Sequence, residues 1–237
     1  NEYFSDGVAE EILNALARID DLKVAGRTSS FYFKGRNETL AAIGSTLGVA
    51  HVLEGSVRKQ GDRLRISAKL LRVSDGVEMW ADTFDGTDAD IFALQESIAQ
   101  RVTSELRVAL DAGQQTRLVA AGTTNPEAYA LYLRAAAIFD RRDISSFPTA
   151  VAALEQAIAL DPKFARAYSR LSALTTIGAA YGGVDLQQDH ERVMQLAGAA
   201  LALDPTLAEP HAVMGQSFAR LTGGLLQQRQ SFERALQ

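Results

Sequence analysis

Histidine and cysteine, two residue types that often carry out catalysis or bind metals, are scarce in this sequence. The 237 residues include three histidines, His51, His190 and His211, and no cysteine. No two of these histidines stand four residues apart, and none has acidic residues at metal-ligand spacing, whereas a metal site needs several converging ligands. Without cysteine, disulfides, thiolate ligands and thiol nucleophiles are excluded. We therefore expect no metal site and no cofactor.

Two groups of acidic residues resemble a calcium-binding loop and a catalytic carboxylate pair, but each lacks a required feature. Residues 85–90 read Asp-Gly-Thr-Asp-Ala-Asp, without the glycine at position six and the distant glutamate of a calcium loop. A turn followed by a helix cap from Thr87 and Asp90 explains them. The adjacent Glu10 and Glu11 cannot share a helix face as a catalytic pair would. No phosphate-binding loop or Gly-x-Ser-x-Gly sequence occurs, so we expect a protein that is not an enzyme.

The most informative charges lie between residues 63 and 72. Arg63, Arg65 and Lys69 alternate with apolar residues, which places them on one face of a predicted strand. The simpler interpretation is a solvated outer face with ion pairs to nearby Glu78 and Asp82. The alternative is a surface that binds an acidic partner or another anionic ligand.

The composition and net charge are those of a globular protein and argue against a nucleic-acid-binding or membrane-spanning chain. Apolar residues make up 47% of the sequence and charged residues 22%, which is typical of a globular chain. The 24 basic and 29 acidic side chains give a net charge of −5, without the basic excess of a nucleic-acid-binding protein. No apolar run approaches the ~20 residues of a membrane span. We expect a protein or peptide partner, no direct contact with nucleic acid and no membrane span.

The chain divides near Gly122, where Asn125 and Pro126 open a new segment rich in helix-forming residues. The pattern predicts an α/β (α+β) domain over residues 1–122, with a mixed sheet that includes an antiparallel meander. Helices cover one face of that sheet. The predicted helices begin at Asp6, Asn37 and Thr87, the last continuing to Leu110. The predicted strands are 22–25, 49–59, 63–73 and 77–84, and residues 29–34 form either a further strand or a loop packed by aromatic side chains.

Residues 123–237 contain an internal repeat. Residues 157–162, Ala-Ile-Ala-Leu-Asp-Pro, return as 200–205, Ala-Leu-Ala-Leu-Asp-Pro, and the chain ends where a third copy of this helix begins. Proline cannot continue a helix, so each copy ends a helix at the same place. The pattern predicts an all-α domain of about three helical hairpins, the last one truncated.

These hairpins resemble the tetratricopeptide repeat, which has large residues, small residues and a proline at fixed places over ~34 residues. Departures are an insertion near residues 178–188 and the replacement of the usual glycine by Ala135 and Ser172. The resemblance places six side chains in a partner-binding groove: Arg166, Ser169, Thr176, Glu209, Gln216 and Arg220. The residues that carry the resemblance are, in the first copy, Leu131, Ala135, Ala150, Ala157 and Pro162; in the second copy, Tyr168, Leu171, Ala200 and Pro205; and in the third copy, Gly215, Phe218, Phe232 and Ala235.

The first domain has a family resemblance of its own, over most of residues 3–110. The segments that carry it are 3–8 (Tyr-Phe-Ser-Asp-Gly-Val), 26–31 (Gly-Arg-Thr-Ser-Ser-Phe), 53–58 (Leu-Glu-Gly-Ser-Val-Arg), 79–81 (Met-Trp-Ala) and 90–95. They resemble the domain that precedes tetratricopeptide repeats in bacterial class III nucleotidyl cyclases and membrane-anchored winged-helix regulators. That domain is similar in fold to the amino-terminal domain of TolB. The resemblance implies a fragment of a longer, membrane-anchored protein, on its cytoplasmic or periplasmic side.

Together these features predict a non-catalytic scaffolding or sensory segment of a larger bacterial signalling or transcription-regulatory protein. It would bind a protein or peptide in the repeat groove. One alternative is a regulatory module of a nucleotidyl cyclase whose catalytic domain lies outside these residues. Another is a self-association module, because the last repeat ends with an apolar flank of Leu225, Leu226, Phe232 and Leu236.

Overall fold

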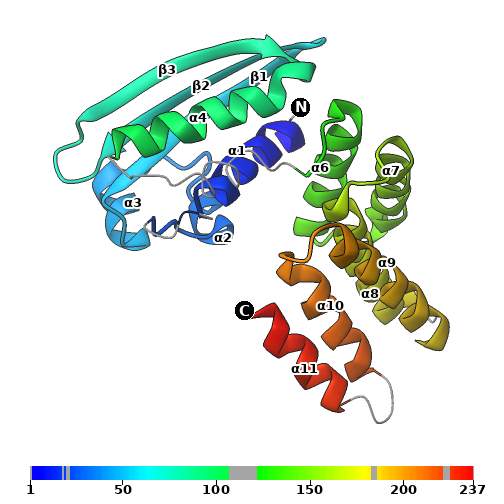
Figure 1. Ribbon diagram of the computed structural model, residues 1–237. Coiled ribbons are helices and arrows are strands. Elements are labelled where there is room, and N and C mark those ends of the chain that lie inside the picture. Colours follow the sequence, from blue (N-terminus) through cyan, green and yellow to red (C-terminus); the bar gives the residue numbers. More distant parts are fainter. Residues whose placement is uncertain are drawn as a thin grey trace. The chain divides into compact units, whose positions relative to one another are not determined.

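A computed structural model describes residues 2–17, 19, 22–106, 122–182, 186–220 and 225–236 of the chain. It divides into two compact units, Asn1–Ala121 and Gly122–Gln237. The first unit combines helices with a small sheet, and the second contains helices in succession (Figure 1).

The sheet of the first unit is an antiparallel meander of β1 (His51–Gln60), β2 (Arg63–Arg72) and β3 (Glu78–Thr87), in that order. Gly61 and Gly76 take positive φ angles of 63° and 70° in the two connections, a conformation that glycine adopts at little cost. The predicted meander is therefore confirmed. The predicted mixed sheet is wrong for the described residues, because all three of their strands pair antiparallel.

The short strand predicted at 22–25 does not form, and residues 29–34, predicted as a strand or a loop packed by aromatic side chains, do not form a strand. Residues 22–26 have no regular structure, and the next segment is a short helix, α2 (Arg27–Phe31). The aromatic side chains of this segment stack against arginine guanidinium groups and take no part in the sheet. The Arg27 guanidinium lies 4.7 Å from the centre of the Phe31 ring, and Arg36 lies 3.6 Å from that of Tyr32. Short aromatic runs become strands only where a neighbouring strand supplies hydrogen bonds.

Two long helices, α1 (Glu2–Ala17) and α4 (Ile91–Glu105), pack together and cover one face of the sheet (Figure 1). Both carry the expected apolar stripe, buried against alternate residues of β2 and against Trp80 of β3. The buried side chains include Val8, Ile12, Leu16, Leu64, Ile66, Leu70, Ile98 and Val102.

The helix ends show which capping predictions were right. The Thr87 backbone N–H donates to the Asp90 carboxylate at 2.8 Å, so the predicted capping box forms, although a short 3-10 helix, η1 (Asp88–Asp90), precedes α4. Asp6 caps nothing, because α1 already includes it. Helix α3 (Leu40–Leu47) is capped by Thr39, not by Asn37, and ends at Gly48 as predicted. The predicted extension of α4 to Leu110 lies outside the described residues.

The described residues of the second unit form three helical hairpins. Asn125 caps the first helix by accepting hydrogen bonds from the N–H groups of Glu127 and Ala128, as the Asn-Pro pair predicted. Each hairpin packs its two helices together, and α8 contacts both α6 and α10, so the first helices of the hairpins are neighbours. The pairs are α6 (Pro126–Asp140) with α7 (Phe147–Leu160), α8 (Ala165–Gly182) with α9 (Leu186–Leu203), and α10 (Ala208–Ala219) with α11 (Leu225–Ala235), with a 3-10 turn, η2 (Ile144–Ser146), before α7.

The two repeated Asp-Pro sequences build the same turn. Asp161 accepts the N–H of Lys163 at 3.0 Å, and Asp204 accepts the N–H of Thr206 at 3.0 Å. Each carboxylate thus starts the turn that leads into the next hairpin. The extra residues of the middle copy lengthen both of its helices, which have 18 residues each against 11 to 15 in the other hairpins.

Two glycines in this unit give a prediction that depends on helix packing. A Cβ on Gly215 would lie 2.8 Å from the Phe232 ring, whereas a Cβ on Gly198 of α9 would contact nothing within 4 Å. We expect Gly215→Val to lower the free energy of unfolding by about 2 kcal/mol, because α10 and α11 must separate. Gly198→Val should change it by less than about 0.5 kcal/mol. Urea unfolding followed by far-UV circular dichroism measures both, and equal effects would contradict this account of the α10–α11 contact.

Candidate interaction surfaces

Five of the six side chains predicted to line a groove lie on α8 or α10, and the sixth, Arg220, directly follows α10. The structure separates them into two groups by burial. Ser169 and Thr176 are only 2% exposed. Ser169 donates its hydroxyl to Glu209 at 2.6 Å, and Thr176 donates to the Ser172 carbonyl at 3.0 Å. Their assignment to an open groove is therefore wrong, because both hydroxyls are used in packing α8.

The other four predicted groove residues are at least partly exposed. Gln216 is exposed on α10, and Arg220 follows that helix as its C-cap. Arg166 lies with its guanidinium 5.1 Å from the centre of the Tyr132 ring, so α6 and α8 meet there. Glu209 is half-buried and takes part in an ion pair that the sequence did not indicate.

That ion pair joins Arg170 of α8 to Glu209 of α10, with Nη1 and Oε1 3.2 Å apart. The Arg170 side chain is only 14% exposed, and its guanidinium also lies 4.6 Å from the centre of the Phe139 ring on α6. Burial alone would lower the pKa of Arg170. Attraction to Tyr132, Glu209 and Asp140 outweighs burial, so the pKa is raised and the side chain stays charged.

Arg170 thus connects the first helices of all three hairpins. A weak sign of this was visible in the sequence, since Arg170 follows Arg166 by one helical turn, but nothing near Arg170 marked Glu209 as its partner. Tyr129 and Tyr132 are buried, and Phe139 is half-buried beside Arg170.

The three histidines lie on different elements: His51 in β1, His190 in α9 and His211 in α10. His190 has a packing role, with Nδ1 2.8 Å from the Ser217 hydroxyl and its ring 5.0 Å from that of Phe218. Burial, with a smaller contribution from Arg234, lowers the pKa of His211. Among the described residues, no group of three or more metal-ligating side chains comes together.

The second candidate surface is the face of the sheet that α1 and α4 leave uncovered, here called the outer face. Arg63, Arg65 and Lys69 all point to it, as the alternation predicted, because the intervening residues of β2 are buried. Arg65 forms two hydrogen bonds with Asp85, at 2.6 and 3.1 Å. Lys69 pairs with Glu54 at 2.8 Å.

The predicted partners of these cations were mostly wrong. Glu78 contributes only a weak attraction to Lys69, and Asp82 accepts the backbone N–H of Thr83 instead. The hydrogen bond from Arg65 lowers the pKa of Asp85, and the hydrogen bond to Glu54 raises the pKa of Lys69. Both ion pairs are exposed and screened by solvent, so they contribute little to stability.

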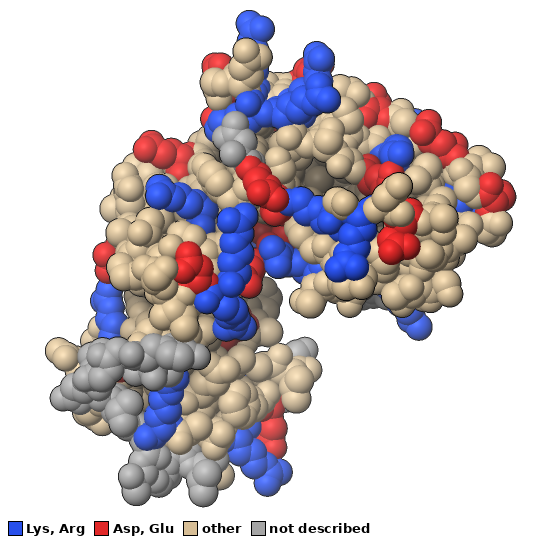
Figure 2. All heavy atoms as spheres, turned by 180° about the vertical axis from the view of Figure 1, so that it is seen from behind, with Lys and Arg blue, Asp and Glu red and all other residues tan. Residues whose placement is uncertain are grey.

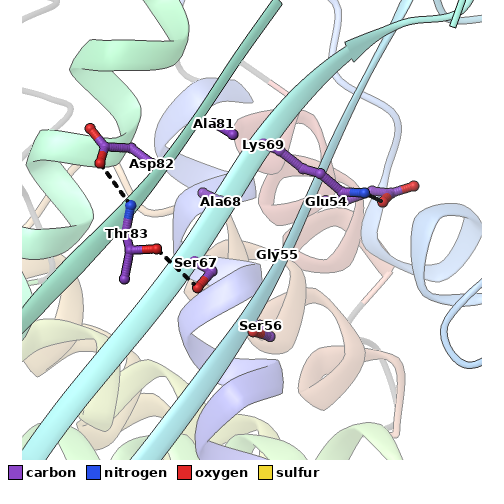
Figure 3. A pocket seen from close by; sticks show the side chains of 9 residues that line it. All are labelled: Glu54, Gly55, Ser56, Ser67, Ala68, Lys69, Ala81, Asp82 and Thr83. Atoms are coloured by element: carbon purple, nitrogen blue, oxygen red, sulfur yellow. Dashed lines mark hydrogen bonds and ion pairs between the residues drawn. The ribbon is translucent and has the colours of Figure 1, made fainter. Parts of the chain in front are cut away.

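A shallow hollow of about 600 Å³ lies on the outer face, because its central side chains are small (Figure 3). The Ser67 hydroxyl lies 3.3 Å from that of Thr83 and forms the floor, while the Lys69–Glu54 pair borders one side. The hollow is lined by Glu54, Gly55, Ser56, Ser67, Ala68, Lys69, Ala81, Asp82 and Thr83.

Neither unit shows a single-sign charge field on the face drawn in Figure 2, where basic and acidic side chains are interspersed. In the described part of the chain, no helix is both long enough and apolar enough to cross a lipid bilayer.

The fold therefore defines a two-part protein, a helix-covered antiparallel sheet followed by stacked helical hairpins. No protein-family model matches the chain. It is similar to a protein of Rhizobium meliloti (strain 1021) named "Putative adenylate cyclase 3", with 36% identity over 172 residues. The match covers 73% of this chain, and the chain spans only 29% of that relative's length. Because neither unit exceeds 121 residues, the match includes parts of both.

Proposed function

We propose that this chain is a non-catalytic regulatory segment of a larger signalling protein of the nucleotidyl cyclase type. The observation that carries the proposal is the match to a cyclase-named relative over parts of both units, with most of that relative lying outside the match. The catalytic chemistry would then belong to the rest of the protein. This favours the cyclase-associated alternative over a transcription regulator.

Within that segment, we assign partner binding to the second unit. Its hairpins have the order, the Asp-Pro turns and the close Gly215–Phe232 contact that a tetratricopeptide repeat domain would have. The first unit would be the TolB-like domain that precedes such repeats. A protein or peptide partner would lie along α6, α8 and α10, where Arg166, Gln216 and Arg220 offer mixed polar contacts.

A photo-crosslinking experiment with the full chain tests the assignment of the partner surface. A benzoylphenylalanine at Gln216 on α10 should crosslink to a defined partner in extracts of the source cells. The same group at Glu155 on α7, which is also exposed, should not. Crosslinks only from position 155, or equally from both, would show that the first helices do not form the binding surface.

Two further measurements separate the remaining functions. Purified chain incubated with ATP and a divalent cation should form no cyclic AMP, and turnover would contradict a non-catalytic role.

Self-association is favoured by Leu226 and Leu236 of the last hairpin, which are 63% and 89% exposed. Phe232 is instead packed against Gly215, and the side chain of Leu225 lies outside the described ones. A mass that rises with concentration, and that Leu226→Gln/Leu236→Gln abolishes, would establish that function.

A further inference from the structure

The outer face of the sheet carries two cations that are not used in the fold. Arg58 and Arg63 are both exposed, and within the described part of the chain neither forms an ion pair or a side-chain hydrogen bond. The neighbouring Lys59 points elsewhere and pairs with Asp88. Arg58 and Arg63 therefore keep their full capacity to bind an anion.

The strand register brings these cations together at one end of the outer face. Arg58 of β1 lies directly opposite Arg65 of β2, and Arg63 is two residues from Arg65 on the same side of β2. Side chains of directly opposed residues lie about 5 Å apart at Cβ, and like charges in that position repel. Asp85 neutralises only one of the three guanidinium groups. An added carboxylate would relieve this repulsion.

The hollow beside the arginines provides room for a peptide. Its volume of about 600 Å³ is within the usual range for ligand sites, and the hydroxyls of Ser56, Ser67 and Thr83 can hydrogen-bond to peptide groups. The two bordering ion pairs, Arg65–Asp85 and Lys69–Glu54, are exposed and weak. They can exchange partners with an incoming carboxylate at little cost.

We infer that the outer face is a docking surface for an acidic segment of a partner protein, with Arg58 and Arg63 as its main charge contacts and the hollow over Ser67 as the seat of the peptide. The argument for this occupant is charge complementarity. Four cations reach this face, Arg58, Arg63, Arg65 and Lys69. Of its carboxylates, Glu54 and Asp85 already pair with Lys69 and Arg65, and Glu78 attracts Lys69, so Arg58 and Arg63 remain for a partner. The surface belongs to the first unit and does not depend on the partner surface proposed for the hairpins.

Fluorescence anisotropy with the full chain and a labelled oligoglutamate peptide tests this inference. The chain should bind the peptide at low salt, and Arg58→Glu/Arg63→Glu should weaken binding at least about tenfold. Salt at ~0.3 M should weaken it as well. The matched control is Arg192→Glu/Arg229→Glu, which makes the same change in net charge on exposed arginines of α9 and α11 and should leave binding unchanged.

A neutral substitution separates a built site from a general electrostatic attraction. Ser67→Tyr fills the hollow without changing the charge, and it should weaken peptide binding at least about fivefold. Unchanged peptide binding in either the charge-reversed or the Ser67→Tyr variant would overturn the inference. It would also be overturned if phosphatidylserine vesicles, but not the peptide, bound the chain through Arg58 and Arg63. Circular dichroism melting of each variant confirms that loss of binding is not loss of folding.

Discussion

Replacing Arg170 by methionine should lower the free energy of unfolding of the second unit by about 3 kcal/mol. The guanidinium is 14% exposed and lies 3.2 Å from Glu209 of α10. It also lies 4.6 Å from the centre of the Phe139 ring on α6. Methionine has a similar length and keeps part of the packing, but it leaves Glu209 and Asp140 without their shared cation. Urea unfolding followed by far-UV circular dichroism measures the loss.

The matched control for this prediction is Arg192→Met. Arg192 also belongs to an ion pair, but that side chain is 51% exposed and lies 3.8 Å from Glu155. Its replacement should change stability by less than about 0.5 kcal/mol. The double variant Arg170→Met/Glu209→Gln should be more stable than the sum of the single effects by about 1 kcal/mol or more. Additive effects, or equal losses at positions 170 and 192, would show that Arg170 does not hold the hairpins together.

Elements defined by local sequence were predictable from the sequence. The three strands of the meander, the Asp-Pro turns and the end of α3 at Gly48 each depend on residues within a few positions of one another. Such signals survive folding because the same short-range hydrogen bonds form wherever the segment lies. The outward direction of Arg63, Arg65 and Lys69 follows in the same way from the alternation along β2.

The partners of these side chains were not predictable, because they depend on register. Lys69 pairs with Glu54 because β1 places Glu54 directly opposite, 15 positions earlier in the chain. An irregularity in the β2–β3 pairing between Leu70 and Leu71 sets Glu78 opposite Leu71. A sequence pattern specifies the face of a strand but not which residue of the next strand lies beside it.

Which polar side chains become buried between helices could not be predicted from the sequence either. Ser169 and Thr176 read as polar groove residues, but α8 has neighbours on several sides and both hydroxyls are enclosed. Small hydroxyl side chains can be buried when a carbonyl or carboxylate accepts their hydrogen bond, as Ser172 and Glu209 do here. Helical periodicity alone does not show how many neighbours a helix has.

The two candidate surfaces offer a partner different kinds of contact. The first helices of the second unit present mixed charges, and Arg170 and Glu209 already form an ion pair with each other. The outer face of the first unit holds two arginines without an ion pair among the described residues, beside a hollow. A partner of the hairpins would meet dispersed polar contacts, from Arg166, Gln216 and Arg220, and, within the part of the chain that the structure describes, no cluster of unpaired cations. A partner of the sheet should be recognised through carboxylates, and only that interaction should weaken strongly with salt.

Truncating Ile98 to alanine should lower the stability of the first unit by about 3 kcal/mol. Ile98 is 0% exposed on α4, which packs against both β2 and β3. The outer face can serve for docking only if this inner face supplies the stability of the sheet, so the prediction tests the basis of the inferred surface. Trp80 is the only tryptophan and is buried in β3, so its fluorescence reports unfolding of this unit.

The adjacent substitution Ser97→Ala is the control for Ile98, since Ser97 is exposed on the same helix and donates only to the Ala93 carbonyl. It should shift the unfolding free energy by less than about 0.5 kcal/mol. If Ile98→Ala were equally mild, α4 would not be a principal cover of the sheet. The stabilising contacts would then have to lie on the outer face, and Ser67→Tyr would lower the unfolding midpoint reported by Trp80. A large loss for Ile98→Ala with an unchanged midpoint for Ser67→Tyr would show that the outer face is free to bind a partner.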